Sequence, residues 1–211
     1  MSTRRSFLRG LQWALIATGV VLLGYWAGMR LHGWVGGSSA VASFEQVRDR
    51  NLPLELPVDT TLWAEDRIAE FEESLDHDFE PPLAVLRIAK IDLEVAVLAG
   101  TSELALNRGV GHIDGTPLPG EAGNVGIAGH RDGYFRGLKD IAVGDEIEVE
   151  TLTGIERFAI TDLTIVEPTD VWVLEPTEIP SITLVTCYPF YFVGSAPQRF
   201  IVRAEIVSRG P

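Results

Sequence analysis

An uncharged apolar run near the start of the chain is its first pattern. The run, Leu11–Met29, contains no charged residue and has no polar face. At 1.5 Å per residue, it is just long enough to cross a bilayer core of about 30 Å. Arg4, Arg5 and Arg9 precede it, so the positive-inside rule places the N-terminus in the cytoplasm. We therefore predict a cytoplasmic N-terminus and transmembrane anchor over residues 1–31, with the rest of the chain extracytoplasmic.

The same segment also resembles an export signal. Thr3–Arg9 is similar to a twin-arginine signal, and Ala40–Ala42 offers small residues for cleavage. However, that site lies about ten residues beyond the apolar run, and the run is longer than the usual 7–15-residue apolar region of a signal peptide. We predict an uncleaved single-pass anchor, with a cleaved or twin-arginine signal as the alternative.

Between the apolar run and the first strand pattern, we predict a linker and one helix. Residues 32–59 mix glycine, serine, proline and charged residues, a composition typical of a flexible stalk. Residues 60–82 are predicted to hold a helix, capped by Thr60 or Thr61, and a connection to the next domain. The apolar residues of this helix follow three- and four-residue spacing: Trp63, Ala64, Ile68, Phe71 and Leu75.

From residue 83 onward, short β-like runs alternate with turn residues, which predicts one domain over residues 83–211. Gly144–Asp145 and Thr153–Gly154 stand where hairpin turns belong, and residues 104–108 predict a helical turn. About eight short strands with few helices predict a mainly β fold, either a small closed barrel or a sandwich. The predicted strands are residues 83–88, 93–98, 124–128, 146–150, 155–166, 171–174, 182–186 and 198–207.

Charge and cysteine content exclude several functions. The net charge of −13 counts against binding to nucleic acid, because neutralising phosphates requires a basic surface. The single cysteine excludes an internal disulfide framework and a multi-cysteine zinc site. No carboxylate cluster has the spacing of a calcium loop. We therefore predict no cofactor and no metal.

Three strand ends carry candidate chemistry. Cys187 follows the predicted strand 182–186, His130 follows Gly129 after the strand 124–128, and Arg199 opens the last strand. Each has an ordinary structural explanation on its own: a buried thiol, a surface histidine or an edge charge. Together they match cysteine-based acyl transfer, in which a histidine activates the thiol and an arginine stabilises the oxyanion.

Two alternatives from other functional classes stay open at this point. One is a cysteine peptidase that releases its acyl product to water. The papain order, with the cysteine before the histidine, is not the order here. The other is an anchored binding domain without catalysis, in which Cys187 packs in the core.

The choice of histidine depends on how each is mounted. His112 lies among glycines and precedes a segment that is typical of a long loop, whereas His130 directly follows an apolar strand. A strand end is the more rigid mount for a group that must be placed precisely, which favours His130 as the acid/base. We predict substrate-binding roles for His112 and for Thr186 and Tyr188, the two neighbours of the cysteine.

The chain from about residue 82 to 207 resembles a sortase, most closely the class D type. The resemblance lies in residues 119–138, in residues 144–151 and in the Thr-Leu-x-Thr-Cys motif at 183–187, followed twelve residues later by Arg199. It implies a closed eight-stranded β-barrel. It also implies Cys187 as nucleophile, His130 as general acid/base and Arg199 as stabiliser of the oxyanion.

The resemblance further implies a reaction and its partners. Sortases cleave a motif similar to LPXTG after its threonine, hold the acyl chain as a thioester and pass it to an amine. The expected partners are surface proteins with a C-terminal LPXTG-like sorting signal, and an amine acceptor on a peptidoglycan cross-bridge or a pilin lysine. The expected location is the cell membrane, with the catalytic domain outside.

Overall fold

The computed structural model describes residues 58–61, 63–77, 79–191 and 196–210. The predicted anchor, the alternative export signal and nearly all of the predicted stalk lie outside these residues. Within the described part of the chain, no helix has both the length and the apolar character needed to cross a membrane.

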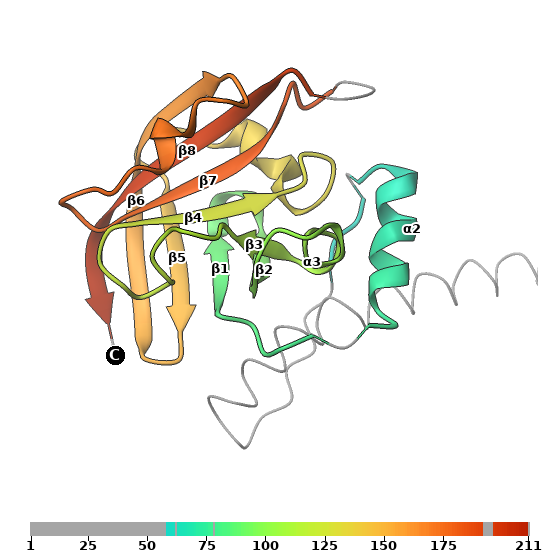
Figure 1. The fold of residues 1–211 in the computed structure, drawn as a ribbon, viewed down its shortest axis with the longest axis horizontal. Helices are drawn as coiled ribbons and strands as arrows, with labels where there is room; N and C mark the ends of the chain where they lie inside the picture. Colours follow the sequence, from blue (N-terminus) through green and yellow to red (C-terminus); the bar gives the residue numbers. More distant parts are fainter. Residues whose placement is uncertain (1–57, 62, 78, 192–195, 211) are drawn as a thin grey trace, which may run out of the picture.

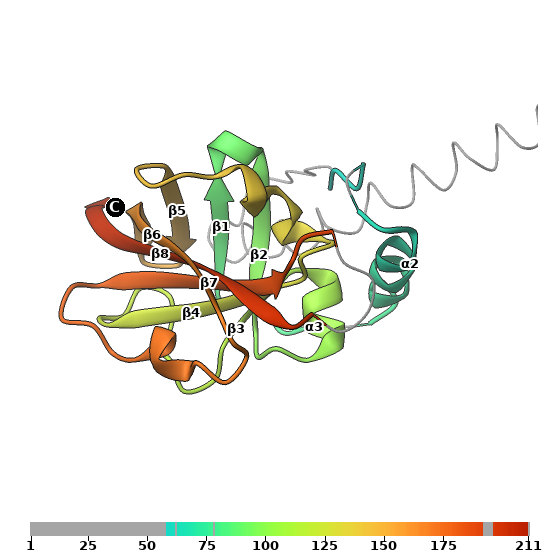
Figure 2. The ribbon, with the colours of Figure 1, turned by 90° about the horizontal axis from the view of Figure 1, so that it is seen from above.

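Eight strands close into a barrel in the order β1-β2-β3-β4-β7-β8-β6-β5 (Figures 1 and 2). The pairs β2–β3 and β4–β7 are parallel, and the other neighbours are antiparallel. The mainly β closed barrel expected from the sequence is therefore confirmed. The strands are β1 (Ala84–Ile88), β2 (Leu93–Ala99), β3 (Val110–His112), β4 (Asn124–Gly129), β5 (Glu146–Thr151), β6 (Gly154–Val166), β7 (Ser181–Tyr188) and β8 (Gln198–Gly210).

Alternation along the strands separates an inner from an outer face. Ile182 and Leu184 of β7 are buried in the main hydrophobic core, together with Val125 and Ile127 of β4 and with Val202 of β8. Because successive strand side chains point to opposite faces, the residues between them face outward. The same alternation determines on which side of the barrel each candidate residue lies.

One predicted strand is wrong. Residues 171–174 form a 3₁₀ helix, η3 (Val171–Leu174), in which Val171 and Trp172 are 70% and 51% exposed. The preceding turn is closed by the Asp170 carboxylate, which accepts a hydrogen bond from the backbone N–H of Glu167 at 2.9 Å. The side-chain amide of Asn124 then donates to the Val173 carbonyl at 3.0 Å, so this segment lies across β4 and does not join the sheet.

One strand was absent from the sequence prediction. β3 is only three residues long, and its central residue is Gly111. A Cβ at this position would lie 2.3 Å from the Gly100 carbonyl oxygen, so glycine permits the close approach of the chain that follows β2. A short glycine-containing strand has too little apolar alternation to be recognised by its pattern.

The described helices are short, and both predicted helical segments are confirmed. They are α2 (Glu65–Ser74) and α3 (Glu103–Arg108), with the 3₁₀ helices η1 (Ala89–Ile91), η2 (Tyr134–Asp140) and η3. The predicted threonine cap of α2 is wrong: its N-cap residue is Ala64, which makes no side-chain capping bond. Thr61 instead donates from its backbone N–H and its hydroxyl to the Asp59 carboxylate, which forms a turn before the helix.

The two predicted hairpin turns have different outcomes. β5 and β6 are joined by a two-residue hairpin loop, with Thr151 paired to Gly154, as expected for this position. Gly144 has a φ of +93°, a conformation that favours glycine, but its turn leads from η2 into β5 and does not join two strands.

Helix α2 lies beside α3 and packs on the barrel (Figure 1). Phe71 is fully buried within the same hydrophobic core as the strands. Trp63 meets the rings of Phe71 and Tyr134 edge to face, with centroids 5.6 Å and 4.6 Å away. The segment before β1 therefore supplies part of the barrel's core packing.

Candidate active site

The parallel pair β4–β7 delivers His130 and Cys187 to the same end of the barrel. The last paired residues are Gly129 and Thr186, and His130 and Cys187 are the next residues of the two chains. Neighbouring strands lie about 4.8 Å apart, so this register brings the imidazole and thiol segments side by side.

The antiparallel pair β7–β8 adds the arginine. Cys187 stands directly opposite Arg199 in the register. Directly opposite residues share one face of a sheet, and their Cβ atoms are typically about 4.5–5.5 Å apart. The thiol and the guanidinium stem therefore project from neighbouring points on the same face.

That face is the outer one. Leu184 is in the core, so Cys187, three positions later, points outward, and Val202 relates to Arg199 in the same way. Ile127 is also in the core, and continuing the alternation by one residue past β4 turns His130 outward. The three predicted catalytic residues thus meet at one rim of the barrel, on its outer side, and Cys187 is half-buried.

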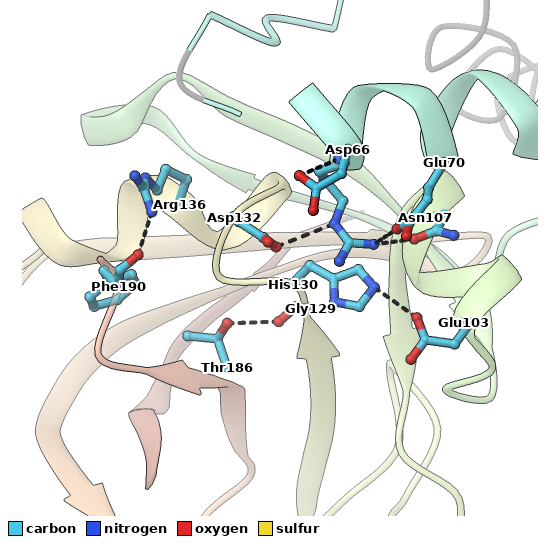
Figure 3. Close-up of polar contacts among 11 residues, drawn as sticks. Asp66, Glu70, Glu103, Asn107, Gly129, His130, Asp132, Arg136, Thr186 and Phe190 are labelled. Atoms are coloured by element: carbon cyan, nitrogen blue, oxygen red, sulfur yellow. Dashed lines mark hydrogen bonds and ion pairs between the residues drawn. The ribbon is translucent and has the colours of Figure 1, made fainter. Parts of the chain in front are cut away.

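The imidazole of His130 is mostly buried, with only 16% of the side chain exposed. Its Nε2 atom lies 3.5 Å from a carboxylate oxygen of Glu103 on α3, as Figure 3 shows. That distance is too long for a good hydrogen bond, and Nε2 is buried without any other partner among the described residues. The long contact with Glu103 is therefore the only polar contact of this ring nitrogen among the described residues.

Burial lowers the pKa of His130 below its ordinary value, and the positive charge of Arg67 lowers it further. The carboxylates of Glu103 and Asp132 act in the opposite direction but do not reverse the shift. The neutral imidazole is therefore favoured at neutral pH. A neutral imidazole can accept the proton of a thiol.

Three hydrogen bonds join the His130 segment to the end of the cysteine strand. The Thr186 hydroxyl donates to the Gly129 carbonyl at 2.7 Å, and Arg131 donates to the Pro189 carbonyl at 3.0 Å. Arg136 donates to the Phe190 carbonyl; Figure 3 shows this contact and that of Thr186. These contacts fix the spacing between the His130 segment and the Cys187 segment from both sides.

Two arginines of β8 lie on the outer face and have different contacts. Arg199 donates through Nη1 to the carbonyls of Gln198 and Ala196, at 3.0 and 3.4 Å, and so stays at the site rim. Arg203 donates through Nη2 to the Val173 carbonyl at 2.6 Å and holds η3 on the barrel. The position beside Cys187 therefore belongs to Arg199.

The three predicted substrate-binding residues lie in different surroundings. Thr186 is 2% exposed on the inner face, where its hydroxyl donates to the Gly129 carbonyl, and its contact with a substrate stays a prediction. Tyr188 packs against the rings of Phe190 and Phe200, with centroids 6.0 and 6.4 Å away.

His112 is 5% exposed and pairs with Ile127, about 10 Å along β4 from His130 at 3.3 Å per residue. Its Nε2 lies 3.0 Å from the Pro117 carbonyl, which identifies this nitrogen as the donor. Contact of His112 or Tyr188 with a substrate stays a prediction.

Sequence reasoning missed the charged residues that surround His130. Asp132 follows it closely, but Arg67 and Glu103 come from α2 and α3, far away in the chain. No pattern in the sequence links these helices to the histidine. In the part of the chain that the structure describes, no group of three or more histidine, cysteine or acidic side chains could hold a metal ion.

Comparison with known proteins places this geometry in a family. Residues 86–207 match the sortase domain. The chain is also 33% identical over 125 residues to Sortase D of Bacillus subtilis (strain 168). That alignment covers 59% of this chain and 63% of the relative, so the chain spans less than two thirds of the relative's length.

Solved structures agree with this match. The chain is 26% identical to a Clostridium perfringens Sortase D5 transpeptidase, with a TM-score of 0.61, covering 82% of this chain and 98% of that one. Sortase C-1 from Actinomyces oris is 27% identical, with a TM-score of 0.56 and coverage of 81% and 97%. Listeria monocytogenes sortase A, at 22% identity, shares the fold. With the domain match spanning more than half of its length, the chain belongs to the sortase family.

Proposed function

We propose that this protein is a membrane-anchored cysteine transpeptidase that cleaves an LPXTG-like sorting motif and joins the acyl part to an amine. One observation carries the proposal: the strand register brings Cys187, His130 and Arg199 together at one outer rim of the barrel. The sortase match supports this reading over a binding domain in which the thiol is only core packing.

The first half of the reaction forms a thioester. His130 takes the thiol proton, and the Cys187 sulfur attacks the carbonyl carbon of the motif's threonine. The carbonyl oxygen becomes an oxyanion beside the Arg199 guanidinium, which stabilises the charge. The C–N bond then breaks, and the leaving amine takes the proton that His130 holds.

The second half transfers the acyl chain. An incoming amine attacks the thioester carbon and gives up its proton to His130. The C–S bond breaks, and the sulfur leaves as a thiolate that regains its proton from His130. The lowered pKa of His130 fits this cycle, because each half starts with a neutral imidazole as base.

The substrate and partners follow from the sortase resemblance. The acyl donor is a surface protein with a C-terminal LPXTG-like signal, and the acceptor is an amine of a peptidoglycan cross-bridge or a pilin lysine. An N-terminal anchor over residues 1–31 would hold the catalytic domain at the outer face of the cell membrane, where both partners are expected. The barrel with its preceding helix, residues 60–211, would then lie in the exported part, after the stalk.

The proposal is tested with the full chain in a mild detergent. LPXTG-like peptides are incubated with a panel of amines, and the products are identified by mass spectrometry. We expect an acyl-enzyme adduct on Cys187 and a ligated product whose yield rises with amine concentration. Cys187→Ala should form neither, while losing only about 1 kcal/mol of stability, because sulfur to hydrogen is a small change.

Two results would contradict the proposal. Hydrolysed product alone, at saturating concentrations of every amine, would identify a cysteine peptidase. The second result has two parts: no acyl adduct forms, and Cys187 reacts with a thiol-specific probe at the same rate in the wild type and in His130→Ala. Together these would identify a binding domain. Cys187→Ser serves as the matched control for adduct formation at the thiol, because it keeps a side chain of similar size but has no thiolate.

A further inference from the structure

Arg67 of helix α2 makes a network of polar contacts directly above the His130 segment. Its Nε donates to the Asp132 carboxylate at 3.3 Å, and its Nη1 donates to the side chains of Asn107 and Glu70. In Figure 3, these three partners lie on the side of the His130 imidazole that faces α2. The Arg67 side chain is only 14% exposed, whereas its partners Asp132 and Glu70 are 30% and 46% exposed.

The backbone shows how closely Arg67 and His130 approach. A Cβ placed on Gly133 would be in ordinary van der Waals contact with both the Arg67 stem and the His130 Cβ, at 3.5 Å each, so Gly133 lies next to both side chains. The Ala64 N–H also donates to the Asp132 carbonyl, at 3.4 Å. Helix α2 therefore holds the loop after His130 through both side chain and backbone.

We propose that Arg67 is a positioning residue of the active site, which fixes the loop after His130 through Asp132 and places a permanent positive charge beside the imidazole. The inference rests on the acid/base role proposed above for His130. It makes α2, which precedes the barrel in the chain, a working part of the catalytic centre.

The charges that face His130 come from three elements. Helix α2 contributes Arg67, with Glu70 bound to it, and α3 contributes Glu103. The histidine's own loop contributes Asp132, which is bound to Arg67, while Arg131 of that loop points to the Pro189 carbonyl. Arg67 is the cation that disfavours the imidazolium, and the facing carboxylates favour it.

Removing the charge therefore has a definite sign. In Arg67→Gln, the repulsion of the imidazolium is lost and Asp132 is released from its partner, and both changes raise the pKa of His130. Glu103→Gln removes an attraction and lowers the same pKa. If Arg67 only anchored α2, removing its positive charge would leave the pKa of His130 unchanged.

The test follows the imidazole by NMR in the full chain, labelled with ¹³C at histidine and kept in detergent. The His130 signal is identified by its absence in His130→Ala. We expect its titration midpoint to rise in Arg67→Gln, to fall in Glu103→Gln and to stay near wild type in Arg67→Lys. Arg157→Gln, which removes a surface arginine paired with Glu148 on the barrel, is the matched control and should change nothing.

Kinetics separate two contributions of Arg67: the geometry of its branched guanidinium and its positive charge. Lysine keeps the charge but cannot bridge three partners, so Arg67→Lys should lower kcat roughly tenfold with KM nearly unchanged, because the imidazole is misplaced. Arg67→Gln should lower kcat by more. If Arg67→Gln does not fold, as judged by circular dichroism, the Arg67→Lys result decides: wild-type kcat would overturn the positioning role.

Failure of this inference differs from failure of the proposed function. An inactive wild-type chain whose His130 midpoint rises in Arg67→Gln would reject the transpeptidase but keep the charge placement. An active wild type, with unchanged midpoint and kcat in Arg67→Gln, would overturn the inference alone.

Discussion

Two arginine side chains near the rim of the barrel differ in their contacts. Arg199 and Arg203 lie on the same strand and the same face, but Arg203 is committed to the Val173 carbonyl while Arg199 faces Cys187 across the sheet. A guanidinium at the rim can present two parallel N–H groups to a developing oxyanion. This difference in contacts, and not residue type, is why the stabilising role is proposed for Arg199.

Arg199→Lys is expected to lower kcat severely even though the charge is kept, because an ammonium cannot reproduce the planar fork. Loss of one oxyanion donor typically costs about 2.7–4 kcal/mol in the barrier. Steady-state kinetics with one peptide and a saturating amine measure the effect. Arg203→Lys is the matched control and should retain most of its turnover; near-normal turnover in Arg199→Lys would move the role to another residue.

His112 and His130, which are both largely buried, give a second comparison between residues. His130→Ala should lower the rate by at least about a hundredfold, within the range of general acid–base catalysis. His112→Ala should have a milder effect, on apparent substrate affinity and on stability, because its Nε2 hydrogen bond to the Pro117 carbonyl is lost. The same kinetic assay compares them, with the exposed His77→Ala as control. The assignment is reversed if His112→Ala is inactive and His130→Ala is not.

At the scale of elements, contacts with η2 and β7 fix the end of β4, directly before His130. Gly129 faces the core there, and a Cβ on it would lie 2.6 Å from the ring of Phe135, which is fully buried. The same residue's carbonyl accepts the hydrogen bond from Thr186. Strand β4 and helix η2 are thus locked together at the point where the chain turns into the site.

Gly129→Ala is therefore expected to push β4 away from Phe135. Overpacking of this kind typically costs about 1–3 kcal/mol. Because His130 is the next residue, turnover should fall as well, even at temperatures where the variant is folded. Chemical denaturation and the peptide assay test both effects. Gly210→Ala, whose Cβ would meet only an ordinary contact of 3.8 Å, should match wild type in both.

At the scale of the whole molecule, α2 closes one side of the barrel over Tyr134. This side chain is 8% exposed, lies in the aromatic group with Trp63 and Phe71, and donates to the Arg108 carbonyl at 3.0 Å. Burial raises the pKa of Tyr134 well above its ordinary range, and the nearby Arg108 only partly opposes this. Folding therefore favours the neutral phenol.

The sign of the resulting pH dependence is fixed. Below the unfolded pKa of about 10, the phenol is protonated in both states and stability is unaffected; above it, only the unfolded chain releases the proton. The free energy of unfolding should therefore fall as pH rises beyond about 10. Tyr134→Phe should remove this step at a cost of roughly 1 kcal/mol at neutral pH, for the lost hydrogen bond. Urea denaturation between pH 7 and 11 tests it, and an unchanged alkaline loss in the variant would contradict it.

Local patterns in the sequence predicted much of the molecule. Alternating apolar residues such as Ile182 and Leu184 marked seven of the eight strands, because the period of two is a property of each strand alone. The same strands showed that Cys187, His130 and Arg199 each lie at a strand end. Residue chemistry then limited what three such groups could do together. These conclusions needed no knowledge of which strand pairs with which.

The tertiary structure decided the partners. Pairing of β4 with β7 is made by backbone hydrogen bonds between segments more than fifty residues apart, and such bonds carry no side-chain signature. The short strand β3 and the 3₁₀ helix η3 were decided by close backbone approach and by an asparagine side chain from another strand. The placement of Arg67 beside His130 arises from packing of α2 on the barrel. Contacts between residues distant in the chain depend on closure of the whole barrel, and therefore only the folded molecule reveals them.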